Sequence, residues 1–170
     1  MSAHSLLMVD GYNVIFAWNE AKRGGWSLDE SRDKLIDALH DYAGYTDENV
    51  VLVFDGYKAD RLQRSVEKRS NVTVVFTKKD ETADAYIERV AAQTPSYVAL
   101  RVVTGDRLEQ LMVLGKGAVR VSSRELLSDM SRLRRSEYAR HAEMPQGNPL
   151  MAHLTEEQRS ILDQLRRNKE

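Results

Sequence analysis

The chain has no cysteine. This excludes disulfides, thiolate zinc sites, iron–sulfur clusters and a cysteine nucleophile, and it fits a reducing compartment. Long hydrophobic runs are also missing: the longest are short, such as Leu6–Val9 and Val50–Phe54, whereas a membrane span needs about 20 apolar residues. The N-terminus lacks a basic start followed by a long apolar stretch, so no signal peptide is expected. We therefore expect a cytoplasmic protein with no membrane partner.

An excess of charge of one sign is lacking too. The 170 residues include 25 Lys and Arg and 26 Asp and Glu, which gives a net charge of −1. Free-standing nucleic-acid binders are often strongly basic, so the distribution of charge matters more here than its total. The content of 42% hydrophobic and 30% charged residues is ordinary for a globular protein. The length predicts one domain, since domains commonly run about 100–200 residues.

Short apolar runs alternate with longer amphipathic stretches. We expect five strands, at residues 5–9, 50–54, 72–76, 97–103 and 118–121. Asp10-Gly11 and Asp55-Gly56 indicate turns after the first two strands. Helices are expected over residues 28–42, 82–93, 108–114 and from Ser122 or Ser123 to about His141, the first with a capping box formed by Ser27 and Glu30. The very polar segment 59–69 is expected to be a short helix or a loop.

Strands that alternate with helices predict βαβ units. We therefore expect an α/β fold with a central, mostly parallel sheet of about five strands, covered by helices on both faces. Residues 144–151 hold two of the three prolines together with Gly147 and Asn148, which is typical of a linker. A last amphipathic helix begins near Thr155. The predicted organisation is a domain over residues 1–143 and a helical C-terminal extension over residues 144–170.

Acidic residues recur where predicted strands end. Asp10, Asp55 and Asp106 follow three of the five strands, and Asp84 begins the helix after a fourth, three residues after Glu81. Ligands of open parallel sheets bind at the carboxyl edge of the strands, so these carboxylates should converge there. Converging carboxylates repel one another unless a cation lies between them. Oxygen ligands favour Mg²⁺ or Mn²⁺, and such sites commonly perform phosphoryl chemistry.

A purely structural interpretation exists for each acid. Aspartate before glycine is a common turn signal, and aspartate near a helix start is a common cap. The coincidence of four acids at one edge favours the metal site. Zinc is not expected, because the chain has no cysteine and its four histidines are scattered.

The motifs at these strand ends resemble those of the YacP-type NYN-domain proteins, which belong to the PIN-like nuclease superfamily. The resemblance extends from about residue 5 to 143. It is carried by the ordered set Asp10-Gly11-Tyr12-Asn13, Val53-Phe54-Asp55, Phe76-Thr77-Lys78, Glu81-Thr82-Ala83-Asp84, Thr104-Gly105-Asp106, Gly115-Lys116-Gly117-Ala118 and Ser123-Arg124-Glu125-Leu126.

The resemblance implies a metal-dependent endoribonuclease. The characterised bacterial member of the family cleaves mRNA within the ribosome, at the A site, during translation. By motif, Asp10 and Asp84 match the family's acidic active-site positions, and Asp55 and Asp106 match acidic positions of the wider superfamily. Asn13 is the signature asparagine and would orient Asp10 or a phosphate. Gly105 departs from the small polar residue that we expect at its position.

Three groups of residues are candidates for RNA contacts. Lys78 and Lys79 precede the acidic helix and would contact the phosphate backbone, unless they are an ordinary solvated loop. Arg120 and Arg124 flank the start of the long helix, where phosphates often bind, although Arg124 could instead pair with an acid of the cluster. A flexible loop with basic and aromatic side chains, in which a base could stack, contains Lys22, Arg23 and Trp26.

The predicted protein is thus a monomeric endoribonuclease that uses Mg²⁺ or Mn²⁺ and has mRNA and the ribosome as partners. Asp10, Asp84 and Asp106 would bind the metal, with Asp55 as an additional ligand and Glu81 as a further candidate; Asn13 completes the catalytic set. A non-catalytic RNA- or ribosome-binding adaptor with the same fold is the alternative. A phosphate acceptor of the receiver or phosphatase type is less favoured. Such a protein needs a second acid beside Asp10 or an Asp-x-Asp motif, and the sequence has neither.

Overall fold

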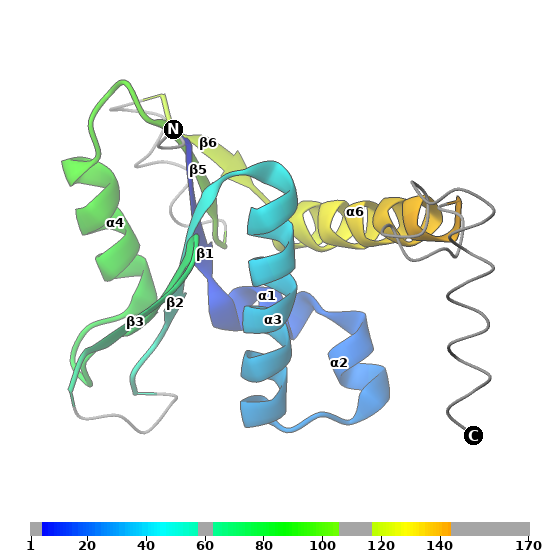
Figure 1. Cartoon of the computed structure of the whole chain (residues 1–170). Helices are drawn as coiled ribbons and strands as arrows, with labels where there is room; N and C mark the ends of the chain where they lie inside the picture. Colours follow the sequence, from blue (N-terminus) through cyan, green and yellow to red (C-terminus); the bar gives the residue numbers. More distant parts are fainter. Residues whose placement is uncertain (1–4, 58–62, 106–116, 144–170) are drawn as a thin grey trace, which may run out of the picture. The chain divides into compact units, whose positions relative to one another are not determined.

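Figure 1 shows the computed structural model of the chain, which describes residues 5–57, 63–105 and 117–143. The chain divides into two units, Met1–Arg135 and Ser136–Glu170. The sheet and the candidate site belong to the first unit. The predicted boundary at residue 143 and the predicted extension 144–170 remain predictions, and the extension lies outside the described residues.

A six-stranded sheet with the order β3-β4-β2-β1-β5-β6 forms the centre of the first unit. β1 lies between β2 and β5, parallel to both, so that Val9 is opposite Leu52 on one side and Val103 on the other. β4 and β6 extend the parallel sheet, and β3 alone is antiparallel. The strands are β1 (Ser5–Asp10), β2 (Asn49–Phe54), β3 (Ser65–Arg69), β4 (Val72–Phe76), β5 (Ala99–Val103) and β6 (Val119–Val121).

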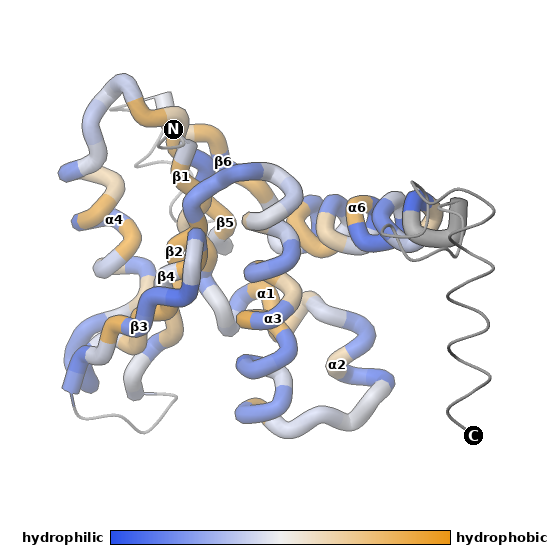
Figure 2. The backbone as a smooth tube through the Cα atoms, viewed as in Figure 1, coloured by the Kyte–Doolittle hydropathy of each residue, from blue (hydrophilic) through white to orange (hydrophobic). Residues whose placement is uncertain are grey.

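Helices cover both faces of the sheet, as the alternating pattern predicts (Figure 1). Leu7 and Val9 of β1 point to one face and pack in a cluster with residues of α1, α3 and α6, whereas Met8 points to the other and packs with Ile87 of α4. Near-continuous apolar character of β1, β2, β4 and β5 follows from this double burial (Figure 2). The described helices are α1 (Gly11–Ala17), α2 (Asn19–Gly24), α3 (Leu28–Thr46), α4 (Ala83–Gln93) and α6 (Ser123–Glu143).

Two capping boxes fix where α3 and α6 begin. The Ser27 hydroxyl accepts from the backbone N–H of Glu30, whose carboxylate accepts from the backbone N–H of Ser27 at 2.8 Å. Ser122 and Glu125 form the same reciprocal pair, at 3.1 and 2.6 Å. The first box and the cap of the long helix confirm the starts that the sequence predicts.

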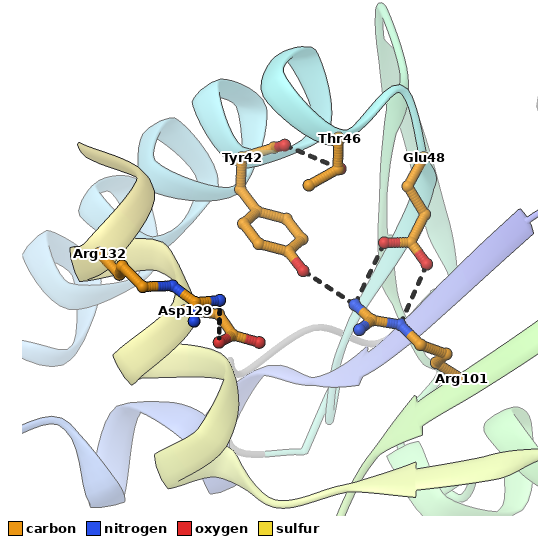
Figure 3. A network of polar contacts seen from close by, with 6 residues as sticks. All are labelled: Tyr42, Thr46, Glu48, Arg101, Asp129 and Arg132. Carbon is orange, nitrogen blue, oxygen red and sulfur yellow. Dashed lines mark hydrogen bonds and ion pairs between the residues drawn. The ribbon is translucent and has the colours of Figure 1, made fainter. Parts of the chain in front are cut away.

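A polar network anchors the end of α3 to β5 (Figure 3). Arg101 of β5 donates to both carboxylate oxygens of Glu48, at 3.2 Å each, and to the Tyr42 hydroxyl at 2.8 Å. Burial alone lowers the pKa of the Arg101 guanidinium, but these partners outweigh it and raise the pKa above its ordinary value. Arg101 therefore stays charged and bridges helix and sheet.

The segment 59–69 corrects the sequence prediction, because its last five residues form strand β3 and not a helix or loop. Every β3 side chain is exposed or half-buried, so the strand lacks the apolar alternation by which strands are recognised. It is held instead by antiparallel pairing with β4, with Ser65 opposite Phe76. Charged Glu67, Lys68 and Arg69 then protect this edge of the sheet from further pairing.

The segment after β1 is a second correction. Asp10-Gly11 is not a turn: Gly11 begins α1, and the Asp10 carboxylate caps this helix by accepting from the backbone N–H of Asn13 at 3.3 Å. Lys22 and Arg23 lie in α2, not in a flexible loop, and Gly25 ends that helix with φ of 60°. Both helices are short, seven and six residues, which hides their periodicity in the sequence.

The remaining elements follow the sequence prediction closely. α4 begins after Thr82, whose hydroxyl accepts from the backbone N–H of Ala85 at 3.1 Å. β5 starts two residues later than expected and β6 one residue later. The helix expected over residues 108–114 lies outside the described residues. None of the described helices combines the length and the apolar character needed to cross a membrane.

Candidate active site

Two of the predicted acids lie at the carboxyl ends of the neighbouring strands β1 and β5 or bind a residue there. Asp10 ends β1, and Thr104 follows β5 at the neighbouring position, because Val9 pairs with Val103. The Thr104 hydroxyl, which is buried, donates to Asp84 Oδ1 over a long 3.5 Å. Asp84 lies in the first turn of α4. Asp84 is therefore tied to the end of β5, the strand that lies next to the strand ended by Asp10.

Asn13 faces the same edge from the first turns of α1. Its side-chain oxygen accepts a hydrogen bond from the Ser123 hydroxyl at 2.6 Å. This bond fixes the orientation of the amide, so that the Nδ2 donor points away from Ser123 and towards Gly105. A Cβ atom on Gly105 would lie 3.1 Å from Asn13 Nδ2. The glycine that departs from the expected small polar residue thus leaves room for the Asn13 amide.

Asp55 lies at the end of β2, next to β1 in the sheet, and forms part of a turn. Its Oδ1 accepts from the backbone N–H of Tyr57 at 3.0 Å, a turn of the Asx type. The following residue, Gly56, is locked to the segment after β4: its N–H donates to Thr77 Oγ1 at 3.0 Å. The Thr77 hydroxyl in turn donates to the carbonyl of Glu81 at 2.7 Å.

Glu81 is held by two arginines. Its side chain is 7% exposed, and its two carboxylate oxygens bind Arg64 and, at 2.7 Å, Arg89. Burial alone raises the pKa of the Glu81 carboxyl, but the hydrogen bond and charge of Arg64 and the charge of Arg89 outweigh it and hold the pKa below its ordinary value. Glu81 is therefore an ionised carboxylate whose two oxygens both bind guanidinium groups.

The oxygen chemistry of the edge fits a hard divalent cation. Asp10 and Asp84 supply carboxylates, and Asn13 and Thr104 supply neutral polar groups beside them. Within the residues that the structure describes, no group of three or more His, Asp or Glu side chains is arranged to hold a metal ion. The further predicted ligand at this edge, Asp106, lies outside the described residues.

The predicted RNA-binding residues are spread over three places. Lys78 and Lys79 are exposed on the segment that joins β4 to α4, at the carboxyl edge. Arg124 is exposed in the first turn of α6, and half-buried Arg120 lies on β6. The neighbouring Glu125 has a lowered pKa. The main causes are hydrogen bonds from the backbone and then the side chain of Ser122, and the charge of Arg120 contributes less.

The third place is α2 and the residues after it. Lys22 and Arg23 are exposed on α2. Trp26 is half-buried: its ring meets the Trp18 ring edge-on, with centroids 5.4 Å apart, and the Lys34 ammonium lies 4.6 Å from its centroid. Trp26 thus packs against its own chain with part of its surface left exposed.

Several residues of the edge escape sequence reasoning. Thr104 and Thr77 occur within motifs at strand ends, but nothing in the sequence predicts their hydrogen-bond partners. Ser123 is recognisable only as a helix cap, yet its hydroxyl reaches Asn13, 110 residues away. Arg64 and Arg89 belong to no motif in the sequence, because their pairing with Glu81 is seen only in the folded chain.

Comparison with known proteins identifies relatives over most of the chain. A family model described as the YacP-like NYN domain matches residues 7–167. The uncharacterised protein YacP of Bacillus subtilis (strain 168) is 39% identical over 132 residues, which cover 76% of this chain and 77% of that protein. The crystal structure of Rae1 (YacP) from Bacillus subtilis matches with a TM-score of 0.69 and 34% identity, covering 96% of this chain and 95% of that one. The crystal structure of a point mutant of the same Bacillus protein matches with a TM-score of 0.67 and 34% identity, covering 95% of this chain and 99% of that one.

Proposed function

The chain belongs to the YacP-like NYN domain family, a family of nuclease-type, PIN-like fold, and from this premise we propose that it is a Mg²⁺- or Mn²⁺-dependent endoribonuclease. Its substrate is mRNA, cleaved on translating ribosomes at the A site, and it acts as a cytoplasmic monomer. The observation that supports the proposal is that Asp10 ends β1 while Asp84 binds Thr104, which directly follows the neighbouring strand β5 at the carboxyl edge.

The residues of this edge divide the work of hydrolysis. Asp10 and Asp84, with Asp106, would hold the cation. A bound Mg²⁺ or Mn²⁺ supplies polarisation of the phosphoryl oxygens and a water of lowered pKa. Thr104 fixes the Asp84 carboxylate by donating to it. The Asn13 amide, oriented by Ser123, offers an N–H donor to a phosphoryl oxygen or to the attacking water. Water attacks directly, because no Ser–His–Asp arrangement provides a protein nucleophile among the described residues.

The near-neutral charge of the chain supports a substrate that is delivered by the ribosome. A nuclease that captures free RNA gains affinity from a large basic surface, whereas this chain has a net charge of −1. The exposed Lys78 and Lys79 would then guide a strand already brought close to the acidic edge.

Cleavage of mRNA on translating ribosomes, with Mg²⁺ or Mn²⁺, tests the proposal directly. Wild type is compared with Asp10→Asn and Asp84→Asn, and with Asp80→Asn as a matched control, because Asp80 is an exposed aspartate four residues before Asp84. We expect cleavage by wild type and by the control, and none by the other two variants. Naked RNA with and without EDTA runs beside them, since EDTA also dissociates ribosomes.

The melting temperature without metal separates catalysis from stability. We expect Asp84→Asn to keep or raise it, because removal of a carboxylate relieves repulsion with Asp10 and the amide oxygen can still accept from Thr104. A large drop would show that Asp84 is chiefly structural. Absence of cleavage in every lane, with the protein still sedimenting with ribosomes, would favour the non-catalytic adaptor.

A further inference from the structure

A cationic cluster lies on a different flank of α4 from Asp84, because Arg89 is five residues further along the helix and so about 140° around it. It consists of Arg64, Glu81, Tyr86 and Arg89. Glu81 lies near the end of the segment that joins β4 to α4, and Arg64 immediately precedes β3. Because β3 is antiparallel and Ser65 is opposite Phe76, Arg64 lies at the carboxyl edge of the sheet. Arg89 lies in the second turn of α4, and its side chain reaches back towards the N-terminus of the helix, where Glu81 is.

The cluster is a built arrangement and not a chance group of surface charges. The Glu81 carboxylate is almost fully buried and binds one terminal nitrogen of each arginine. Both guanidinium groups also lie over the Tyr86 ring, with their central carbons 5.5 and 5.2 Å from its centroid. Two long, rotamer-rich side chains are thereby held in fixed positions, and the ordering cost of their binding to a ligand is already met.

The held guanidiniums keep donors for a ligand. Each guanidinium has five N–H donors, and the bonds to Glu81 use a single nitrogen of each. The side chains of Arg64 and Arg89 are 35% and 45% exposed. Because two arginines share one carboxylate, the cluster has a net charge of +1. It would attract an anion that has two free oxygen acceptors, such as a phosphate group. Charged guanidinium groups that keep unused N–H donors bind phosphate oxygens well.

We propose that Arg64 and Arg89, held in place by Glu81 and Tyr86, bind a backbone phosphate of the RNA strand outside the scissile position. This inference rests on the proposed function, because it gives the nuclease site a second point of contact with its substrate. Glu81 acts in it as a positioning residue and not as a metal ligand. The exposed Lys78 and Lys79 lie on the same segment as Glu81, between β4 and α4.

The salt dependence of RNA binding measures the contact. Each phosphate contact to a single strand contributes about 0.7 to the slope of log K against log salt concentration. The probe is a fluorescein-labelled single-stranded RNA oligonucleotide, titrated by anisotropy in EDTA over a series of KCl concentrations. We expect Arg64→Ala and Arg89→Ala each to reduce the slope by about 0.7 relative to wild type.

The controls distinguish this contact from general charge and from catalysis. Arg69→Ala removes an arginine from the same edge strand, where Arg69 pairs with Glu67 on the surface, and is expected to leave the slope unchanged. Asp84→Asn is expected to abolish cleavage and to keep the slope. Melting temperatures confirm that each variant is folded. If Arg64→Ala does not fold, Arg89→Ala decides alone, because Glu81 then still has Arg64 as its partner.

Two results would overturn the proposal: a wild-type slope in both arginine variants, or no binding of the oligonucleotide by wild type. A wild-type protein that binds with the expected slopes but cleaves no RNA on ribosomes has a different meaning. It would refute the nuclease activity and leave the phosphate contact standing as a property of an RNA-binding protein.

Discussion

At the scale of single residues, the orientation of the Asn13 side chain depends on two residues from distant parts of the chain. The Ser123 hydroxyl engages its oxygen, and Gly105 leaves room for its nitrogen. Ser123 is buried at the start of α6, so its hydroxyl has few other acceptors. Ser123, which the sequence indicates only as a helix cap, therefore decides which end of the Asn13 amide points towards the acidic edge.

Ser123→Ala is expected to lower the cleavage rate by roughly 10–100-fold, the usual cost of losing a partner that orients an active-site ligand. Ser123→Thr keeps the hydroxyl and should restore much of the rate. Ser122→Ala is the matched control: loss of the N-cap of the same helix should cost about 1 kcal/mol of stability and leave cleavage intact. Cleavage kinetics and urea unfolding of all three variants check this. Equal losses of rate in both alanine variants would assign Ser123 a merely structural role.

The structure also changes the interpretation of Glu81. Its two arginine partners lie 17 and 8 residues away in the sequence, at the edge strand and on α4. Spacing in the sequence alone groups Glu81 with the nearby acids. Once a fold supplies cations, a carboxylate beside a metal site can serve to hold arginines. Asp10 and Asp84 differ from it because they accept hydrogen bonds from neutral groups, the backbone N–H of Asn13 and the Thr104 hydroxyl.

At the scale of elements, the turn after β2 and the segment after β4 are joined by a close backbone approach. A Cβ atom on Gly56 would lie 1.6 Å from the carbonyl oxygen of Thr77. Only glycine allows this approach, and the buried Thr77 hydroxyl completes the joint. The position of the segment 77–81, and with it the start of α4, thus depends on the absence of a side chain at residue 56.

Gly56→Ala is therefore expected to lower the free energy of unfolding by about 1–3 kcal/mol, as overpacking of a tight site does. Gly44→Ala is the matched control, because Gly44 lies inside α3 with nothing within 4 Å of an added Cβ. It should raise the free energy of unfolding by about 0.5–1 kcal/mol. Urea denaturation of both variants measures the two signs. A stabilising Gly56→Ala would contradict the close approach.

Elements with strong local signals could be predicted, and those held by tertiary contacts could not. The apolar runs of β1, β2, β4 and β5 and the capping serines of α3 and α6 are properties of their own residues, and the structure confirms them. β3 owes its form to pairing with β4, so its own polar residues do not reveal it. Helices α1 and α2 have too few residues for a periodicity to be visible.

The carboxyl-edge rule predicts which strand ends meet, because all strands except β3 run in one direction. It correctly places Asp10 at the end of β1 beside β5, and Asp84 binds Thr104 after β5. It cannot predict hydrogen-bond partners, since these depend on side-chain orientation and on contacts between residues far apart in the sequence. Asp55 in its turn and Glu81 with its arginines are known only from the folded chain.

At the scale of the whole molecule, near-neutrality conceals a local separation of charge. The net charge is −1, yet one flank of α4 carries Asp84 and the other carries Arg89 with Arg64 beside it. Such an arrangement suits an RNA strand that has one phosphate bound through a metal ion beside Asp84 and another phosphate bound directly by the arginines. The buried Glu81 couples this surface to the stability of the entire fold.

That coupling predicts a pH dependence of global unfolding. Because the pKa of Glu81 is lower in the folded chain than its ordinary value of 4.5, the unfolded chain takes up the proton first as the pH falls, and Glu81 stabilises the fold only while it is ionised. Glu81→Gln is therefore expected to cost about 1.5–3 kcal/mol at pH 7, the worth of hydrogen bonds to a charged group. The gap to wild type should close progressively below pH 4.5, through the folded pKa. Urea unfolding of both proteins from pH 7 to about pH 3 measures the gap, with Glu67→Gln on the surface as control. A gap that stays constant over this range would mean that Glu81 titrates alike in both states and that its arginines do not hold it.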